Sequence, residues 1–262
     1  MKFCVALLLL AFSALAADPG ESCRTLERRG KRNEANACFK KLAASNSAAA
    51  RAEGLWGLRE YKAANDQFKV AVAQQPTNAD LRVRWGRLFL ERFNPPEAQT
   101  LFKEALEIQP KHAGATLGIA LIASDGFDKQ AVEFAEQALQ LDPKLVEAQE
   151  LLAKLALEDS NEAKAIELAD KAMKMAPDAL DAMAVRLAID LLEDKKPSEW
   201  EVRINAINPV YGDAWSLAGH ILVLNRRYEE GIAAYKKALE LDPNLQSARA
   251  QLGMNLMRLG EE

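Results

Sequence analysis

One pattern of apolar and polar positions recurs along the chain and ends each time in a proline. Its copies are ALEIQP (105–110), ALQLDP (138–143), AMKMAP (172–177), AINP (206–209) and ALELDP (238–243). The prolines on this period are separated by 34, 33, 34, 32 and 34 residues; they are Pro76, Pro110, Pro143, Pro177, Pro209 and Pro243. A spacing this regular predicts an array of structural repeats.

Each repeat is expected to fold as two antiparallel helices. When the proline is numbered 32, positions 8, 20 and 27 tend to be small and positions 4, 11 and 24 large, as with Gly219, Trp215 and Leu222 in the unit that ends at Pro243. Small side chains let two helices approach closely, and large ones fill the space around that contact. The proline ends the second helix at the residue before it.

This pattern resembles the tetratricopeptide repeat, a helix–turn–helix unit of about 34 residues. The resemblance implies an all-α fold: a right-handed superhelix, or α-solenoid, of about seven stacked antiparallel hairpins plus a terminal helix. Pentatricopeptide repeats have a similar period but read RNA, which neither the acidic composition nor the proline at position 32 suits. Sel1-like repeats vary more in length than these units do.

The repeats are expected to occupy nearly the whole chain. The segment 178–209 carries the pattern weakly, but it has the length of one repeat and is interpreted as a drifted unit. The expected organisation is a capping hairpin at 17–44 and a solenoid at 45–262, with units at about 45–78, 79–111, 112–145, 146–177, 178–211 and 212–245 and a partial unit at 246–262.

The N-terminal sequence MKFCVALLLLAFSALAA has the three parts of a secretory signal: a cation, an apolar run and small residues. We expect cleavage after Ala16, so that residues 1–16 are a signal peptide. A membrane anchor is the alternative, but the apolar run of about ten residues falls short of the roughly 20 that span a bilayer. The mature chain is therefore expected to be periplasmic or secreted, without a membrane span.

Cys23 and Cys38 lie symmetrically about the turn of the first hairpin, which contains Gly30. Residues equidistant from the turn of an antiparallel helix pair face each other, as a disulfide requires. Export would provide an oxidising compartment. We therefore expect a Cys23–Cys38 disulfide that stabilises the hairpin by about 3 kcal/mol. Two buried free thiols are the alternative.

Composition and motifs exclude several classes of function. The chain has 34 Lys and Arg against 38 Asp and Glu, a net charge of −4, which is the wrong sign for a dedicated nucleic-acid binder. His112 and His220 each lack a nearby set of ligands, so no metal site is expected. The sequence has no HExxH, G-x-S-x-G, phosphate loop or dinucleotide-binding turn. We expect a non-catalytic protein without a cofactor.

The resemblance implies a concave surface, lined by the first helix of each unit, that receives a peptide or a partner helix. Positions 2, 5, 9, 12 and 13 of each unit would point inward. The candidate partner-binding residues are Trp56, Arg87, Glu91, Leu121, Lys154, Leu157, His220 and Met254. Position 9 carries no Asn, so the carboxylate clamp of some family members is not expected. Packing between repeats is the alternative role for each residue.

The last unit is a first helix alone, since the chain ends at Glu262, where a second helix would begin. Met254, Leu256, Met257 and Leu259 are not the polar outer face expected of a cap, so we expect the protein to continue.

Three roles stay open. The favoured one is a non-catalytic scaffold of the bacterial cell envelope that binds a peptide or helix of a partner protein in the groove. The second is the N-terminal recruitment region of a larger exported enzyme, for example a peptidase with its catalytic domain beyond Glu262. The third is self-association through the end helices.

Overall fold

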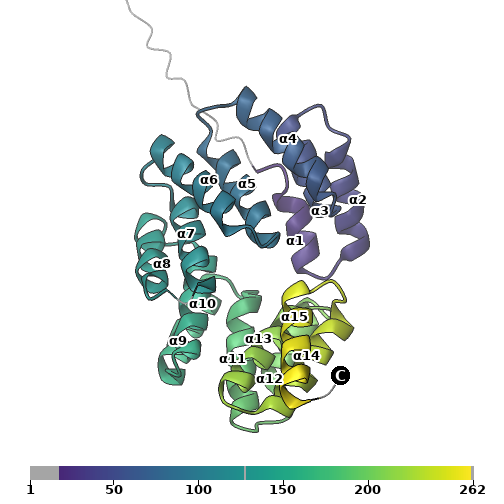
Figure 1. Ribbon diagram of the computed structural model, residues 1–262, viewed down its shortest axis with the longest axis vertical. Coiled ribbons are helices and arrows are strands. Elements are labelled where there is room, and N and C mark those ends of the chain that lie inside the picture. Colours follow the sequence, from purple (N-terminus) through teal and green to yellow (C-terminus); the bar gives the residue numbers. More distant parts are fainter. Residues whose placement is uncertain (1–17, 127, 261–262) are drawn as a thin grey trace, which may run out of the picture.

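The computed structural model describes residues 18–126 and 128–260, which form fifteen α-helices and no strand (Figure 1). The helices are α1 (Glu21–Arg28), α2 (Arg32–Ala43), α3 (Ala48–Gly57), α4 (Tyr61–Gln74), α5 (Ala79–Glu91), α6 (Pro95–Ile108), α7 (Ala113–Asp125), α8 (Gln130–Leu141), α9 (Val146–Glu158), α10 (Glu162–Met175), α11 (Leu180–Leu192), α12 (Glu199–Ile207), α13 (Gly212–Leu224), α14 (Tyr228–Leu241) and α15 (Gln246–Leu259). They pair as seven antiparallel hairpins, with α15 left as a single helix. This confirms the all-α superhelical repeat fold.

The expected signal peptide lies outside the described residues. None of the helices that the structure does describe combines the length and apolarity needed to cross a membrane.

The turns inside the hairpins recur with the period of the repeat. Five of them place a residue other than glycine in the left-handed backbone region, with φ between 54° and 64°: Arg59, Phe93, Ser160, Asp194 and Arg226. Such a residue ends the first helix of the unit and reverses the chain. Side-chain caps begin several of the helices, as where Asn78 accepts a hydrogen bond from the backbone N–H of Leu81 at 3.3 Å.

Helices approach closely where a glycine faces an aromatic ring. Phe102 of α6 is fully buried. A Cβ built on Gly86 would lie 2.7 Å from Cε1 of Phe102, and one built on Gly118 would lie 2.5 Å from its Cζ. Tyr235 meets Gly219 in the same way. The small and large positions of the sequence pattern therefore do pack against each other, both within a unit and across to the next one.

The drifted unit keeps its two-helix hairpin, but its two helices differ in length. Its second helix, α12, has nine residues, and its first helix, α11, packs directly against α13. The largest hydrophobic cluster forms here and spans α9 to α13, with Met183, Val185 and Leu187 of α11 at its centre. A strongly apolar first helix thus replaces the packing that a full-length second helix provides elsewhere.

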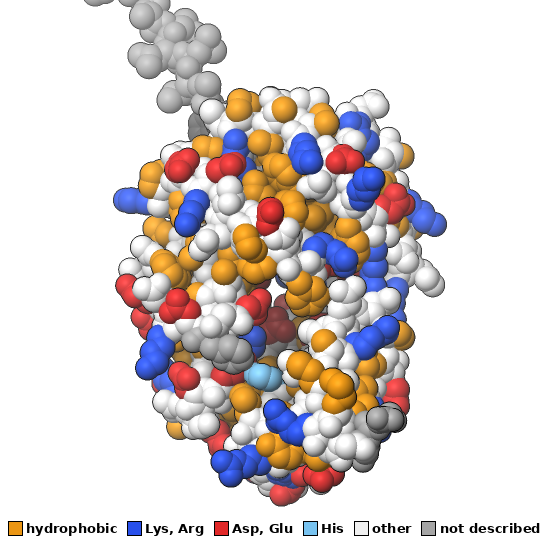
Figure 2. Space-filling view, in the orientation of Figure 1, with side chains coloured by type: hydrophobic (Ala, Val, Ile, Leu, Met, Phe, Trp, Pro, Cys, Tyr) orange, Lys and Arg blue, Asp and Glu red, His pale blue; other side chains and the backbone are white. Residues whose placement is uncertain are grey.

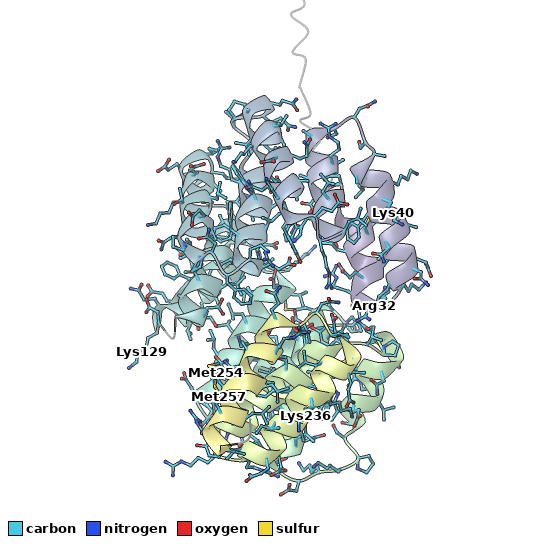
Figure 3. The ribbon with its side chains drawn as sticks, turned by 45° about the vertical axis from the view of Figure 1, so that its right-hand side comes forward. Arg32, Lys40, Lys129, Lys236, Met254 and Met257 are labelled. Atoms are coloured by element: carbon cyan, nitrogen blue, oxygen red, sulfur yellow. A yellow bond between two sulfur atoms is a disulfide. The ribbon has the colours of Figure 1, made fainter. Side chains whose placement is uncertain are left out.

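The solenoid curves so strongly that its two ends meet (Figures 1 and 3). We call residues 18–108 the N-terminal arm, residues 178–259 the C-terminal arm, and their contact the seam. At the seam the side-chain amide of Asn208 donates to the carbonyl of Arg28 at 3.0 Å. The guanidinium of Arg32 donates to the carbonyl of Leu241 at 3.2 Å and lies 3.7 Å from Asp242. Residues about 180 to 210 apart in sequence are therefore neighbours, and the solenoid closes into a ring.

The hairpin that forms the N-terminal side of the seam is cross-linked. Cys23 of α1 and Cys38 of α2 form a disulfide, with their Cα atoms 5.4 Å apart. Cys23 is fully buried beside Ala35 and Phe39. The cross-link holds α1 against α2, and these two helices carry the seam residues Arg28 and Arg32.

Candidate binding surface at the inner face and the seam

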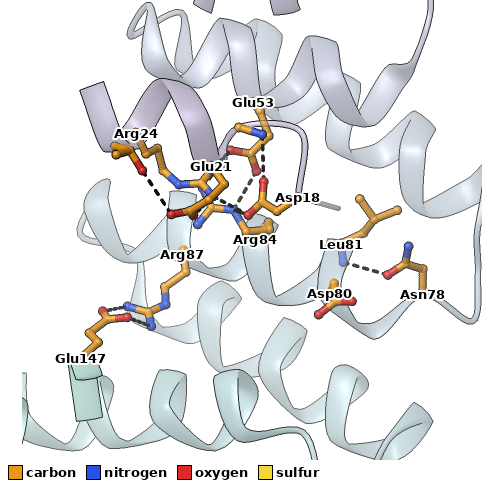
Figure 4. Close-up of polar contacts among 12 residues, drawn as sticks. Asp18, Glu21, Arg24, Glu53, Asn78, Asp80, Leu81, Arg84, Arg87 and Glu147 are labelled. Carbon is orange, nitrogen blue, oxygen red and sulfur yellow. Dashed lines mark hydrogen bonds and ion pairs between the residues drawn. The ribbon is translucent and has the colours of Figure 1, made fainter. Parts of the chain in front are cut away.

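An ion pair bridges the inner face of the ring. Arg87 of α5 binds Glu147 of α9 with two hydrogen bonds of 2.5 and 2.9 Å (Figure 4). The pair passes over α7, so it joins first helices of units that are not neighbours. Because a bidentate guanidinium–carboxylate pair fixes both side chains, Arg87 holds the curvature of the ring and does not stand free in a groove.

A second bridge lies one step further along the ring. Nε2 of His220 in α13 lies 3.4 Å from Oε1 of Glu158 in α9, and Nζ of Lys154 lies 3.7 Å from the same oxygen. Burial alone would raise the pKa of Glu158, but the contact with His220 and the charge of Lys154 lower it below its ordinary value. His220 and Lys154 therefore have an internal carboxylate partner.

The inner face of the N-terminal arm is built around a buried carboxylate. Glu53 is 3% exposed and accepts hydrogen bonds from Arg24 at 2.6 Å and from Arg84 at 2.7 and 2.8 Å (Figure 4). Asp18 also pairs with Arg24. Two cations on one buried anion offset its loss of hydration, and the cluster fastens α1 to α3 and α5.

The aromatic residues beside this cluster are also engaged. The guanidinium of Arg84 lies 4.4 Å from the ring centre of Trp56. The indole N–H of Trp56 donates to Glu91 at 2.5 Å, and the hydroxyl of Tyr61 donates to the other oxygen of Glu91 at 2.9 Å. Burial and the charge of Glu91 raise the pKa of Tyr61 to about 12. The structure brings the predicted residues Trp56 and Glu91 together, but as partners of each other.

The other predicted groove residues lie in different surroundings. Leu157 is 3% exposed and belongs to the core between α9 and α13, so its placement in an accessible groove is wrong. The curvature of the ring draws the first helices together over it. Leu121 is half-buried against the core of α7 to α9. Met254 of α15 is 50% exposed (Figure 3).

A row of carboxylates that are not among the candidate partner-binding residues lies toward the hollow of the ring, where Figure 2 shows acidic side chains deep inside. Three of its four members occupy the inward repeat positions 2 and 5, but their crowding was not predicted. The row consists of Glu147 and Glu150 of α9, Asp181 of α11 and Asp213 of α13. Asp181 accepts a hydrogen bond from the hydroxyl of Tyr211 at 2.5 Å. Glu147, Asp181 and Asp213 are first-turn acids of their helices, a position at which carboxylates stabilise helix N-termini. Glu147 and Glu150 share one face of α9, and the direct packing of α11 against α9 and α13 brings Asp181 and Asp213 toward them.

This crowding changes the acid–base behaviour of the row. Desolvation, with the charge of Asp181 next in importance, raises the pKa of Glu150 to about 8. Asp213 reaches solvent inside the hollow, yet the surrounding protein desolvates it, and with the charges of Asp181 and Asp242 this raises its pKa to about 7.

Two large cavities lie along the seam, and a small one lies beside it within the N-terminal arm. The largest, ≈ 610 Å³, lies between Arg28 and Arg32 of the N-terminal arm and Tyr211 and Asp213 of the C-terminal arm. A small one of ≈ 130 Å³ adjoins Trp56 and Glu53. The third, ≈ 520 Å³, we call the outer cleft; it is lined by Arg59, Tyr61, Leu90, Glu91 and Phe93 on one side and by Asp242, Pro243, Asn244, Leu245, Gln246, Ser247 and Arg249 on the other. Arg59 lines all three cavities.

No group of His, Cys, Asp and Glu in residues 18–126 and 128–260 is arranged to hold a metal ion.

Comparison with known proteins identifies the repeats. Sequence models of the tetratricopeptide repeat match residues 212–245 and 83–144. A curated relative, the RNA polymerase-associated protein CTR9 of Caenorhabditis elegans, is 33% identical over 78 residues, which are 29% of this chain and only 7% of that protein.

Solved structures share the fold at low sequence identity. A tetratricopeptide repeat protein from Parabacteroides merdae is 15% identical, with 90% of this chain and 96% of that chain covered and a TM-score of 0.58. The Cut9–Hcn1 hetero-tetramer of the APC/C is 12% identical, with 91% and 48% covered and a TM-score of 0.62. Together with the 34-residue period and the stacked helix hairpins, the matches at residues 83–144 and 212–245 identify a tetratricopeptide-repeat protein, and the solved structures share its fold.

Proposed function

We propose that the protein is a non-catalytic scaffold of the bacterial cell envelope that binds a segment of a partner protein. The tetratricopeptide repeat fold is that of a protein–protein interaction scaffold, which supports the coarser part of the proposal. The signal-like N-terminus supports the envelope location.

The observation that carries the proposal is the pair of large cavities along the seam. Their volumes, ≈ 610 and ≈ 520 Å³, lie in the range of ligand sites in proteins. The inner face itself is bridged by Arg87 with Glu147 and by His220 with Glu158. A partner segment is therefore expected to enter between the two arms, where polar and apolar side chains remain open to it.

Affinity capture tests the scaffold role. The chain from Ala17 onward, immobilised through its C-terminus, is incubated with a native envelope fraction, cross-linked and analysed by mass spectrometry. We expect one or a few proteins to be enriched over the same chain after reduction and denaturation. Equal recovery on the folded and the denatured chain would rule out a specific scaffold.

Cell fractionation tests the location. The full chain is expected in the periplasm or the medium, with the mass of a protein that begins at Ala17. Retention in the cytoplasm at full-length mass would contradict the envelope assignment without affecting the scaffold role.

A further inference from the structure

We propose that the outer cleft binds an extended, acidic segment of a partner protein, whose carboxylates pair with Arg59 and Arg249. This inference rests on the proposed function and names the chemistry of the partner.

The two arginines are the open cations of the cleft. Arg59 lies in the left-handed turn between α3 and α4, and its guanidinium makes no hydrogen bond, ion pair within 4 Å or aromatic contact with the described part of the chain. Its charge acts at longer range on Glu27, where it partly offsets the rise in pKa that burial causes. Arg249 of α15 donates to the carbonyl of Pro243 and has no carboxylate partner among the same residues. Because the two belong to opposite arms, a segment that pairs with both lies across the seam.

The carboxylates of the cleft, by contrast, already have partners. Glu91 accepts hydrogen bonds from Trp56 and Tyr61, and Asp242 lies 3.7 Å from Arg32. Arg92 adds a further cation 4.5 Å from the ring centre of Tyr61. The lining itself is balanced, with Arg59 and Arg249 against Glu91 and Asp242. With the neighbouring Arg32, Arg92 and Glu27 included, four cations stand against three anions, and the two open cations favour an anionic ligand.

An apolar surface lies beside these charges. Phe93 is 64% exposed, and its left-handed backbone, φ 54°, turns it into the mouth of the cleft. Leu90 on the same side and Leu245 on the other are half-buried. An exposed aromatic ring next to unpaired arginines is the kind of surface that anchors a protein partner, so the segment is expected to carry an apolar residue among its acids.

Defined peptides test the proposal. The probe is a fluorescein-labelled peptide of Glu, Leu and Ser, acetylated and amidated so that only side-chain carboxylates are present, and binding is measured by anisotropy at low and moderate salt. We expect saturable, salt-sensitive binding to the chain from Ala17 onward. Peptides with Gln or Lys in place of Glu should bind at least about tenfold more weakly, since they lose both ion pairs.

Two matched variants locate the site. Arg59→Gln is expected to weaken binding about fivefold, the effect of one largely solvent-exposed ion pair, and the double variant Arg59→Gln, Arg249→Gln further still. Arg226→Gln is the control: Arg226 holds the same left-handed turn position between α13 and α14, is exposed, and lines none of the three cavities. It should change binding less than about twofold.

Several outcomes would overturn the proposal. They are absence of binding by the acidic peptide, equal binding of the lysine peptide, and equal effects of Arg59→Gln and Arg226→Gln. Tighter binding of a single-stranded oligothymidylate than of the acidic peptide would assign the cleft to nucleic acid instead. If the double variant still captures the same envelope protein as the native chain, the cleft assignment is wrong while the scaffold role stands; if the native chain captures none, the scaffold role itself fails.

Discussion

The ring of Phe102 in α6 packs against Gly86 of α5 and Gly118 of α7, so three helices meet at this residue. Truncating it leaves a cavity that two glycines cannot fill, so Phe102→Ala is expected to lower the free energy of unfolding by about 3–5 kcal/mol. Chemical denaturation measures the loss. Phe93→Ala, at an exposed ring, is the control and should cost less than about 0.5 kcal/mol. Similar losses for both would mean that the packing around Phe102 is not tight.

The acidic row makes stability depend on pH. The pKa of Glu150 is about 8 in the folded chain against 4.5 ordinarily, so between these values the folded state holds a proton that the unfolded state has released. The free energy of unfolding therefore falls as the pH rises from about 4.5 to about 8. Glu150→Gln is expected to flatten this decline by up to about 1.4 kcal/mol per pH unit.

Denaturation at several pH values between 4 and 9 measures that slope. Glu136→Gln, at an exposed position of α8 outside the row, is the control and should leave the slope unchanged. If Glu150→Gln and Glu136→Gln give the same pH profile, the pKa of Glu150 is not raised in the folded state.

At the scale of the helices, the first hairpin has a neighbour on one side in the stack and is held by its disulfide. The variant Cys23→Ser, Cys38→Ser is expected to destabilise α1 and α2 by about 3 kcal/mol, because the loop of about 15 residues is no longer closed. Hydrogen exchange should accelerate in these two helices. Exchange in α7 and α8, in the middle of the solenoid, should change little; an equal acceleration there would show that the hairpin unfolds only with the whole chain.

The helices were largely predictable because each repeat specifies its own hairpin locally. Each unit is specified by residues that are close in sequence: the proline at position 32, small residues such as Gly86 and large ones such as Phe102. In the drifted unit the sequence indicated its length, but not that α11 would pack directly against α13. That contact depends on how short α12 is, which tertiary packing decides.

At the scale of the whole molecule, the inner face was the least predictable feature. Repeat position predicted that Arg87, Lys154 and His220 point inward, but it could not show that the ring closes tightly enough for Arg87 to reach Glu147 across an intervening helix. Small rotations between neighbouring units accumulate along a solenoid. The overall curvature therefore cannot be predicted from the sequence of any single repeat. The cavities of the seam depend on the same accumulated curvature, since their two sides lie far apart in sequence.

Closure of the ring depends on Gly30, at the tip of the first hairpin. Its φ of +68° suits glycine, and a Cβ there would lie 2.5 Å from Oδ1 of Asn208 on the opposite arm. Asn208 is 5% exposed and is held in place at both ends of its amide, since it donates to the carbonyl of Arg28 and accepts from the backbone N–H of Val210. Gly30→Ala is therefore expected to push the arms apart, because the backbone strain and the steric clash both act at the seam.

Small-angle scattering measures the result as a larger radius of gyration at unchanged helicity. Gly253→Ala is the control: this glycine lies within α15 with nothing within 4 Å of an added Cβ, so the variant should keep the native radius. If the outer cleft holds a ligand across both arms, the acidic peptide should also bind Gly30→Ala more weakly than Gly253→Ala, since part of its binding energy must then restore the seam. Equal radii for the two variants would show that the seam is not held through Gly30 and Asn208.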